Sequence, residues 1–249
     1  MTDYKILVTN DDGIEAEGIK ALAKGLRKLS DVKVTVVAPE RERSATSHSL
    51  TLHRPLRIIK KDKDDYAVDG TPTDSVMLGM SVIMKKKVDL IVSGINRGGN
   101  LGDDVHYSGT VSAAIEGGIM GIPSIAISQL GRDKFNYDTA VRFAQKLIGV
   151  VRRNPLPPGI VLNVNVPANC DNLDFKICKT GKRNYGEIYE ERIDPRGRPY
   201  YWIGGNLYEF QNIPESDCNA IQSGKISITP LKVNITDHNF IDSMKAWKW

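Results

Sequence analysis

The sequence predicts an α/β fold built on a mainly parallel sheet. Short apolar runs, typical of strands buried on both faces, alternate with amphipathic helical segments through residues 1–152. Polar and glycine-rich segments follow several of these strands, as they do at the carboxyl ends of an open parallel sheet. A chain of 249 residues can bury such a core in one domain. We therefore expect a single domain, with its core at residues 1–152 and a C-terminal extension at residues 153–249.

The chain begins with a strand–helix–strand unit. Ile6–Thr9 has strand propensity and runs directly into a polar segment. Gly18–Leu29 carries apolar residues at helical spacing, which predicts an amphipathic crossover helix. Val34–Ala38 is a near-continuous apolar run that stops at Pro39, as expected for a buried strand. These segments predict a βαβ unit.

The same alternation continues through the rest of the core. Thr71 begins a helix, because a capping hydroxyl is followed by Pro72 at the first helical position and by Asp74 in the first turn. The expected elements are an extended pair at Leu52–Lys60 and Tyr66–Val68 around a charged turn, a helix from Thr71 to about Met84, a strand at Val88–Ser93, a glycine-rich loop at residues 94–104, a helix at Val111–Met120, a strand at Pro123–Ser128 and a helix at Tyr137–Val151.

The C-terminal extension begins at a proline-rich crossing and contains fewer regular elements. Ile160–Val166 and Lys225–Thr229 are predicted strands, and the second should end at Pro230. Asp237–Trp247 should close the chain as an amphipathic helix.

Residues 174–210 predict a hairpin arm around the turn Asp194–Arg198. A two-stranded projection carrying Tyr200, Tyr201 and Trp202 is not stable alone and would expose much apolar surface. We expect the arm and the terminal helix to pack on a partner subunit in a homodimer or homotetramer. An interface is a more common role for this aromatic cluster than base stacking.

Composition excludes several classes of protein. The net charge of +4 arises without a dominant basic block, so it does not favour binding to duplex nucleic acid. Cys170, Cys178 and Cys218 are odd in number and lack a CxxC spacing, which argues against a disulfide framework and against a zinc site. The N-terminus lacks a signal-peptide pattern, and no apolar run approaches the length of a membrane span. We expect a cytoplasmic protein.

Two adjacent carboxylates follow the first strand. Asn10, Asp11, Asp12 and Gly13 lie where an open α/β sheet binds ligands, outside the carboxyl ends of its strands. Like charges side by side repel, and a bound cation is the simplest way to keep both ionised. The alternative is that these acids only cap the helix that follows.

Further oxygen donors follow other strands. Ser44, Thr46 and Ser47 come after the second strand, and Asn96 comes after Val88–Ser93. A hard cation such as Mg²⁺ or Mn²⁺ prefers a shell of carboxylates, neutral oxygens, water and substrate phosphate.

Ser108, Gly109 and Thr110 precede a helix and form the second candidate feature. They can offer a phosphate unpaired backbone N–H groups, hydroxyl donors and the positive end of a helix dipole. The alternative is an ordinary helix cap.

Several ordered motifs resemble the SurE family of survival proteins, which are 5′/3′-nucleotidases. The motifs cover nearly the whole chain and are Val8–Ile14, Ala38–Ser49, Asp69–Asp74, Ser93–Asn100, Tyr107–Val111, Ile228–Leu231 and Thr236–Asp237. The resemblance implies a single domain with a Rossmann-like three-layer core and a C-terminal region used in dimer formation. It implies a divalent-metal-dependent phosphatase acting on nucleoside monophosphates, with metal ligands at Asp11, Asp12, Ser44 and Asn96. Glu40 stands where an aspartate is common, which casts little doubt because it is not a ligand.

The expected reaction is hydrolysis of a nucleoside 5′-monophosphate to nucleoside and inorganic phosphate, and the resemblance extends the range to 3′-monophosphates and short polyphosphate. We expect one divalent cation per subunit, Mg²⁺ or Mn²⁺, and attack by a water that it activates. Asn10, Asp11 and Asp12 are the expected catalytic residues. The expected phosphate-binding residues are Asn10, Asn96, Ser108, Gly109 and Thr110. The alternative route is an aspartyl-phosphate on Asp11, which we disfavour because a carboxylate engaged on a metal is a poorer nucleophile.

For several residues, and for the function as a whole, the sequence permits more than one interpretation. His48 could protonate the leaving group or only make a supporting hydrogen bond, and His106 could cover the phosphate site. Asp103 and Asp104 could solvate or cap the glycine-rich loop, or hold a second metal. His53 and His238 are expected to be structural. The rival functions are a receiver-like signalling module, disfavoured because Asn96 stands where that module needs an aspartate, and a nonenzymatic nucleotide sensor.

Overall fold

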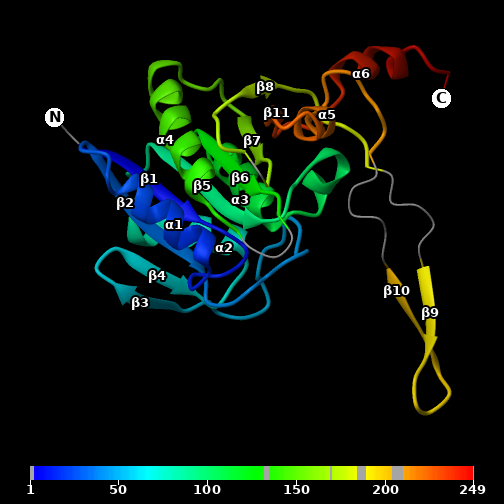
Figure 1. Ribbon diagram of the computed structural model, residues 1–249, viewed down its shortest axis with the longest axis horizontal. Helices are drawn as coiled ribbons and strands as arrows, with labels where there is room; N and C mark the ends of the chain where they lie inside the picture. Colours follow the sequence, from blue (N-terminus) through cyan, green and yellow to red (C-terminus); the bar gives the residue numbers. More distant parts are fainter. Residues whose placement is uncertain (1–2, 132–134, 169, 184–188, 204–209, 249) are drawn as a thin grey trace.

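The computed structural model describes residues 3–131, 135–168, 170–183, 189–203 and 210–248. Its main sheet has the strand order β3-β4-β2-β1-β5-β6-β7-β11-β8 (Figure 1). Neighbouring strands are parallel, except that β3 is antiparallel to β4 and β11 is antiparallel to β7. The predicted α/β fold with a mainly parallel sheet is therefore confirmed.

The strands are β1 (Tyr4–Thr9), β2 (Val32–Pro39), β3 (Ile58–Asp62), β4 (Asp65–Val68), β5 (Leu90–Arg97), β6 (Ser124–Gln129), β7 (Ile160–Val166), β8 (Phe175–Ile177), β9 (Tyr189–Ile193), β10 (Pro199–Ile203) and β11 (Ile226–Lys232). The helices are α1 (Glu17–Leu26), α2 (Pro72–Leu78), α3 (Gly109–Ile119), α4 (Asp138–Arg153), α5 (Asp217–Gln222) and α6 (His238–Lys245), together with a π-helical segment η1 (Gly79–Ile83) and a 3₁₀ helix η2 (Gly102–His106).

Helices cover both faces of the sheet and complete three layers. On one face α1 packs against α4 so closely that a Cβ atom at Gly25 would lie 2.2 Å from Cγ1 of Val141. On the other face α2 and α3 pack together, and a Cβ atom at Gly117 would lie 2.2 Å from Oγ of Ser124 in β6. The larger apolar core lies between the sheet and the α1–α4 layer. This burial on both faces explains why the strands are near-continuous apolar runs.

Two predicted strand ends were wrong. β5 continues through Arg97, because Asn96 and Arg97 still pair with β6 after a register shift that begins at Gly94. The segment 94–104 was therefore predicted to be a glycine-rich loop, although its first four residues belong to β5. β11 does not end at Pro230 but runs to Lys232. β8 pairs with β11 only up to Ile228, so Pro230 removes no ladder hydrogen bond on that side.

The predicted helix start at Thr71 is confirmed. Its hydroxyl accepts a hydrogen bond from the backbone of Asp74, and the Asp74 carboxylate accepts one from the backbone of Thr71. This reciprocal pair satisfies two N–H groups that a helix start leaves without partners. The last turns of the segment are the π-helical η1, and none of α5, η2 or the π-helical geometry was predicted.

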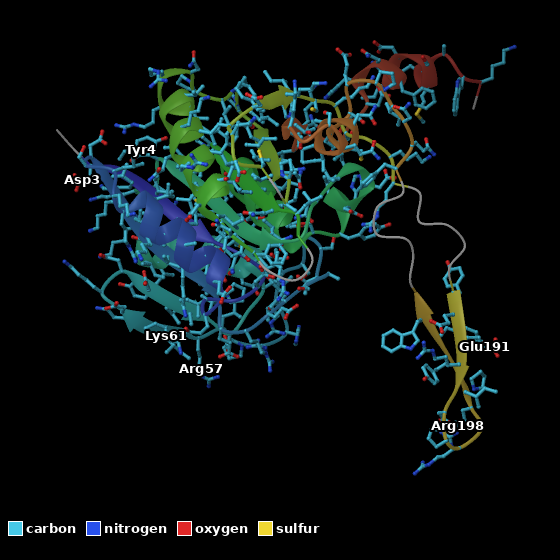
Figure 2. All side chains as sticks on the ribbon, viewed as in Figure 1. Asp3, Tyr4, Arg57, Lys61, Glu191 and Arg198 are labelled. Atoms are coloured by element: carbon cyan, nitrogen blue, oxygen red, sulfur yellow. The ribbon has the colours of Figure 1, made fainter. Side chains whose placement is uncertain are left out.

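The predicted arm is shorter than residues 174–210. Phe175–Ile177 is strand β8 of the main sheet, and the hairpin consists of β9 and β10 around a turn closed by Asp194 and Arg198. Figures 1 and 2 show this hairpin projecting from the body, with Glu191 and Arg198 far from the sheet. Helix α6 has no buried residue. The oligomeric role of both elements stays a prediction.

The main sheet takes strands from both parts of the chain, since β7, β8 and β11 all lie beyond residue 152. The division of the single domain into a core at residues 1–152 and an extension at residues 153–249 stays a prediction. Among the helices that the structure describes, none has the length and apolar character needed to cross a membrane.

Candidate metal and phosphate site

The site lies where the carboxyl ends of β1, β2 and β5 meet the start of α3. Thr9 of β1 pairs with Ser93 of β5, so the segments that follow them leave the same edge of the sheet. Asn10 to Asp12 follow β1, and Asn96 lies at the end of β5. The loop with Ser44 follows β2 and is attached to this edge by a 2.7 Å hydrogen bond from the Arg43 backbone N–H to the carbonyl of Asp11.

Asp11 lies against the N-terminus of α3. The Thr110 hydroxyl donates a hydrogen bond to Oδ1 of Asp11, and both side chains are buried. A Cβ atom at Gly109 would lie 2.8 Å from Cβ and 2.9 Å from Oδ2 of Asp11, closer than real Cβ atoms approach such atoms. Gly109 therefore permits the close contact between the acidic strand end and the proposed phosphate loop, two segments that are far apart in the sequence.

Asp12 contacts the end of β5. Its Oδ2 accepts a 3.2 Å hydrogen bond from the backbone N–H of Arg97, next to Asn96. The Asn96 amide nitrogen donates a 2.8 Å hydrogen bond to the carbonyl of Gly98. This bond uses the nitrogen and not the carbonyl oxygen of the Asn96 side chain, and the oxygen is the atom that binds hard cations.

Asn10 is fully buried and has one unsatisfied polar atom. Its amide nitrogen donates a 2.9 Å hydrogen bond to the carbonyl of Gly13, while its Oδ1 has no hydrogen-bond partner among the described residues. A buried acceptor without a partner is costly, and such an atom is a signal of an unseen ligand or water. The expectation that Asn10 donates to phosphate is therefore less well supported than a role for its oxygen.

Ser44 is exposed, and its hydroxyl donates a 2.7 Å hydrogen bond to Oε1 of Glu42. Ser47 in the same loop donates a 2.8 Å hydrogen bond to the carbonyl of His106, which joins the loop to η2. Thr46 donates to the carbonyl of Arg43 and so only closes the loop.

Negative charge dominates the electrostatics of the site, and the positive charge of Arg97 offsets it only in part at Asp12. Burial raises the pKa of Asp11, against the opposing effect of its hydrogen bonds with Thr110. Burial first, and then the negative charges of Asp11 and Glu42, raise the pKa of Asp12 to about 6. In the described part of the chain, neither aspartate forms an ion pair with a basic side chain. A bound cation would relieve this repulsion.

Ser108 is the N-cap of α3, because its Oγ accepts a 3.1 Å hydrogen bond from the backbone N–H of Val111. The capping interpretation is therefore correct for this residue. Capping uses the oxygen of Ser108 as an acceptor, so the hydroxyl proton remains able to reach a phosphate oxygen.

Several residues near the site were missed by sequence reasoning. Glu42 adds negative charge, Glu116 contacts His48, and Arg183 forms a 2.6 Å ion pair with Asp104. Tyr137 lies close enough to Asp12 for that carboxylate, together with burial, to raise the pKa of the phenol. Glu42 lies within the Ala38–Ser49 motif but was not singled out, and the other residues lie outside the quoted motifs, so only the tertiary structure brings them to the site.

The remaining candidates lie outside the carboxylate cluster. The Asp104 carboxylate pairs with Arg183, which differs from the expected solvation of the glycine-rich loop. His238 contacts the side chain of Asn234 at 3.1 Å, in keeping with a structural role, and His53 is exposed. No group of three or more His, Cys, Asp or Glu side chains that could hold a metal ion occurs in the described ranges, so Asp103 and Asp104 belong to no such group, and the carboxylate site has only two acids beside its neutral oxygen donors.

Comparison with known proteins decides the family. The family model described as survival protein SurE matches residues 6–187, which include every candidate metal and phosphate residue. The chain belongs to the SurE family. The resemblance seen in its motifs is thereby confirmed.

Members of the SurE family match nearly the whole chain. The 5′-nucleotidase SurE of Geotalea uraniireducens (strain Rf4) is 50% identical over 246 residues, covering 98% of each chain. The 5′-nucleotidase SurE of Myxococcus xanthus (strain DK1622) is 44% identical and covers 98% of this chain and 93% of its own. The crystal structure of the SurE protein from Aquifex aeolicus superposes with a TM-score of 0.88 at 42% identity, covering 97% of this chain and 98% of that one.

Proposed function

We propose that this SurE-family protein is a divalent-metal-dependent nucleotidase that hydrolyses nucleoside 5′-monophosphates to nucleoside and inorganic phosphate. The observation that carries the proposal is the contact between Asp11 and the start of α3. It joins a carboxylate pair, which suits a cation, to a helix N-terminus, which suits a phosphate. Full-length relatives named 5′-nucleotidase support the same activity.

The donor set fits a hard divalent cation. Every candidate ligand is an oxygen donor, and Asp11, Asp12, Asn96 and Ser44 would hold the ion. Burial raises the pKa of both aspartates and Oδ1 of Asn10 has no hydrogen-bond partner among the described residues, and a bound cation would stabilise all of these oxygens. When bound, a divalent cation would supply Lewis-acid stabilisation of the phosphate charge. We propose one Mg²⁺ or Mn²⁺ per subunit.

The first turn of α3 would bind the phosphate. The backbone N–H of Val111 is used by the Ser108 cap and that of Ser112 by the Ser108 carbonyl, whereas the N–H of Gly109, in the first turn, has no partner within the helix. Thr110 already supports Asp11 and would share its hydroxyl and backbone donors between that carboxylate and the phosphate. Because these donors are fixed before substrate binds, they can stabilise the negative charge that develops in the transition state.

Direct attack by water is the route that the contacts of Asp11 support. Oδ1 of this carboxylate already accepts the Thr110 hydroxyl hydrogen bond, which reduces its nucleophilicity. Hydrolysis of an AMP analogue with a chiral phosphoryl group separates the routes. Inversion at phosphorus is expected for water, whereas retention would favour an aspartyl-phosphate on Asp11.

Release of inorganic phosphate from AMP tests the activity. We expect turnover with Mn²⁺ or Mg²⁺, none with EDTA, and recovery when metal is restored. Parallel reactions with a 3′-monophosphate and a short polyphosphate define the substrate range. Tight AMP binding without phosphate release would instead support the nucleotide sensor. We propose a cytoplasmic location, because all three cysteines are free thiols.

A further inference from the structure

A cavity of about 250 Å³ lies beside the candidate site. Its walls include Arg97 at the end of β5, Leu101 from the segment that follows, Leu130 after β6, Asp104 of η2, and Arg183 and Phe210. Arg183 and Phe210 form an isolated antiparallel bridge, so they bring together the chain segments that lead into and out of the β9–β10 hairpin. The C-terminal extension therefore contributes directly to a cavity next to residues of the core.

The cavity is close to the proposed reaction centre. Arg97 belongs to its wall, and the backbone N–H of Arg97 donates to Oδ2 of Asp12. Gly98 also belongs to the wall, and its carbonyl accepts the hydrogen bond from the Asn96 side chain. A ligand with its phosphate at Asp11 and Asp12 could thus extend into the cavity past these two residues.

The lining combines an apolar surface with a fixed polar rim. Phe210 packs with Leu101, Leu130 and the buried Cys218 in one apolar cluster, which holds the aromatic ring in place. On the rim, the Asp104–Arg183 ion pair measures 2.6 Å, and its two side chains are only 15% and 14% exposed. Such a pocket suits a flat ligand with apolar faces and polar edges.

We propose that this cavity binds the nucleoside part of the substrate, with its base against Phe210. The inference rests on the proposed nucleotidase activity and adds the part of the molecule that recognises the base. An aromatic side chain stacks with any nucleobase, because every base has a π-face. The rim supplies a carboxylate acceptor and guanidinium donors for the polar edges of the base or ribose.

A chain of further phosphates is the competing occupant, since two arginines line the cavity. The charge of Arg183 is already balanced by Asp104, and the apolar wall offers phosphate no hydrogen bonds. Phosphate groups would be stripped of water without compensation against Leu101 and Leu130. The lining therefore favours a nucleoside over polyphosphate.

The test compares AMP with ribose 5-phosphate, which carries the same phosphate ester but no base. Phe210→Leu keeps an apolar side chain and removes the aromatic face. We expect it to raise KM for AMP by on the order of tenfold, the scale of a lost stacking contact, with little change for ribose 5-phosphate. Phe210→Tyr should restore KM for AMP. Phe175→Ala, which removes an exposed aromatic side chain on β8, is the matched control and should change KM for neither substrate.

Equal effects of Phe210→Leu on AMP and ribose 5-phosphate would overturn the proposal, as would higher KM for tripolyphosphate alone. Calorimetry with adenosine in the absence of metal gives an independent reading. If adenosine binds to the wild-type protein and not to Phe210→Leu, the result supports the cavity as the nucleoside site. This holds even if no phosphate is released from any ester, an outcome that would refute the nucleotidase activity alone. Absence of adenosine binding together with normal AMP hydrolysis and unchanged KM in Phe210→Leu refutes only the cavity.

Discussion

Nε2 of His48 lies 2.8 Å from Oε2 of Glu116, a carboxylate on α3 that is 7% exposed. The contact connects the loop that carries Ser44 to the helix whose first turn faces Asp11. Sequence reasoning left His48 as either a general acid or a supporting hydrogen-bonded residue. A buried carboxylate partner holds the imidazole in one orientation, which supports the positioning role.

Glu116→Gln should therefore weaken metal binding through the loop and not through the chemistry. We expect a several-fold higher metal concentration for half-maximal activity, with kcat at saturating metal nearly unchanged. Glu15→Gln, at an exposed acid paired with Lys20, is the matched control. If His48→Gln abolishes kcat while Glu116→Gln leaves the enzyme intact, His48 is a general acid and the positioning role is wrong.

Asp12→Asn should lower metal affinity and phosphatase activity together. The change removes one negative charge at nearly constant shape, and hard cations depend on that charge. Titration of the metal into EDTA-treated protein by calorimetry measures the effect. Asp103→Asn, at the acid weighed for a second metal, should bind metal normally. Equal affinities for the wild-type protein and Asp12→Asn would remove Asp12 from the ligand set.

The metal-free protein should lose stability as pH rises, because of Asp12. Its pKa in the folded protein is about 6, above the ordinary 3.8, so the folded state favours the protonated form. The stabilisation is full below the unfolded-state pKa and is lost as pH rises through the folded-state value. Asp12→Asn imitates the neutral carboxyl group, so without metal it should be more stable than the wild-type protein at pH 7 and equal to it near pH 4.

Urea unfolding at these two pH values, in EDTA, makes the comparison. Saturating Mg²⁺ or Mn²⁺ should reverse the order at pH 7, since a ligand that binds only the folded state stabilises it. A wild-type protein that remains the more stable one in EDTA at pH 7 would show that burial does not disfavour the Asp12 charge.

Gly109→Val should abolish activity while the protein still folds. Gly109 does not have a positive φ, so the reason is contact and not backbone conformation: an added Cβ would lie within 3 Å of Asp11. The carboxylate would be displaced from the place where metal and phosphate meet. Circular dichroism checks the fold and phosphate release checks the activity. Gly149→Val, inside α4 and far from the site, is the control, because Gly149 does not have a positive φ. Gly98→Val would not serve, because Gly98 has a positive φ that valine rarely adopts.

Thr110→Val should be milder than Gly109→Val. It keeps the shape of the side chain and removes the hydroxyl that donates to Asp11. Loss of one donor to a developing charge costs about 2.7–4 kcal/mol or less, so kcat should fall by no more than about a thousandfold. An unchanged kcat would mean that the Thr110 hydroxyl does not act in the transition state.

Local patterns were sufficient to predict most of the fold. The apolar runs that became β1 and β2 are buried on both faces, and the Thr71 cap has the expected reciprocal hydrogen bonds. Errors arose where tertiary pairing overrode local signals, as in β5, where β6 extends the strand into a glycine-rich segment. Ser216 does cap α5, but a single capping residue before a helix of six residues is too weak a signal.

The candidate site was predictable to the extent that strand ends converge in a parallel sheet. Asp11 and Asp12 follow β1 and Asn96 lies at the end of the neighbouring β5, so their proximity follows from strand order. The cavity with Phe210 and Arg183 was not predictable, because it depends on a bridge between segments on either side of the hairpin. Residues 174–210 were assigned only to an interface, and no local pattern indicated their contact with η2.

The hairpin and α6 remain the predicted oligomer interface. Tyr201 and Trp202 of the hairpin are 59% and 58% exposed, and Phe240 and Trp247 stack edge to face at the exposed end of the chain. Trp249, which also entered the prediction, lies outside the described residues. Apolar side chains gathered on two projecting elements favour burial against a second copy, because a two-fold axis covers both elements of both subunits at once.

Truncation before Asp237 removes α6 and should shift the species in solution to a smaller oligomer or to aggregates. No proposed metal or phosphate ligand is lost, so activity per folded subunit should fall only through the altered assembly. Tyr201→Ser with Trp202→Ser tests the hairpin, and Ile177→Ser, at an exposed position on β8, is the matched control. Light scattering gives the molar mass at micromolar concentration. A full-length protein that is monomeric under these conditions would refute the interface.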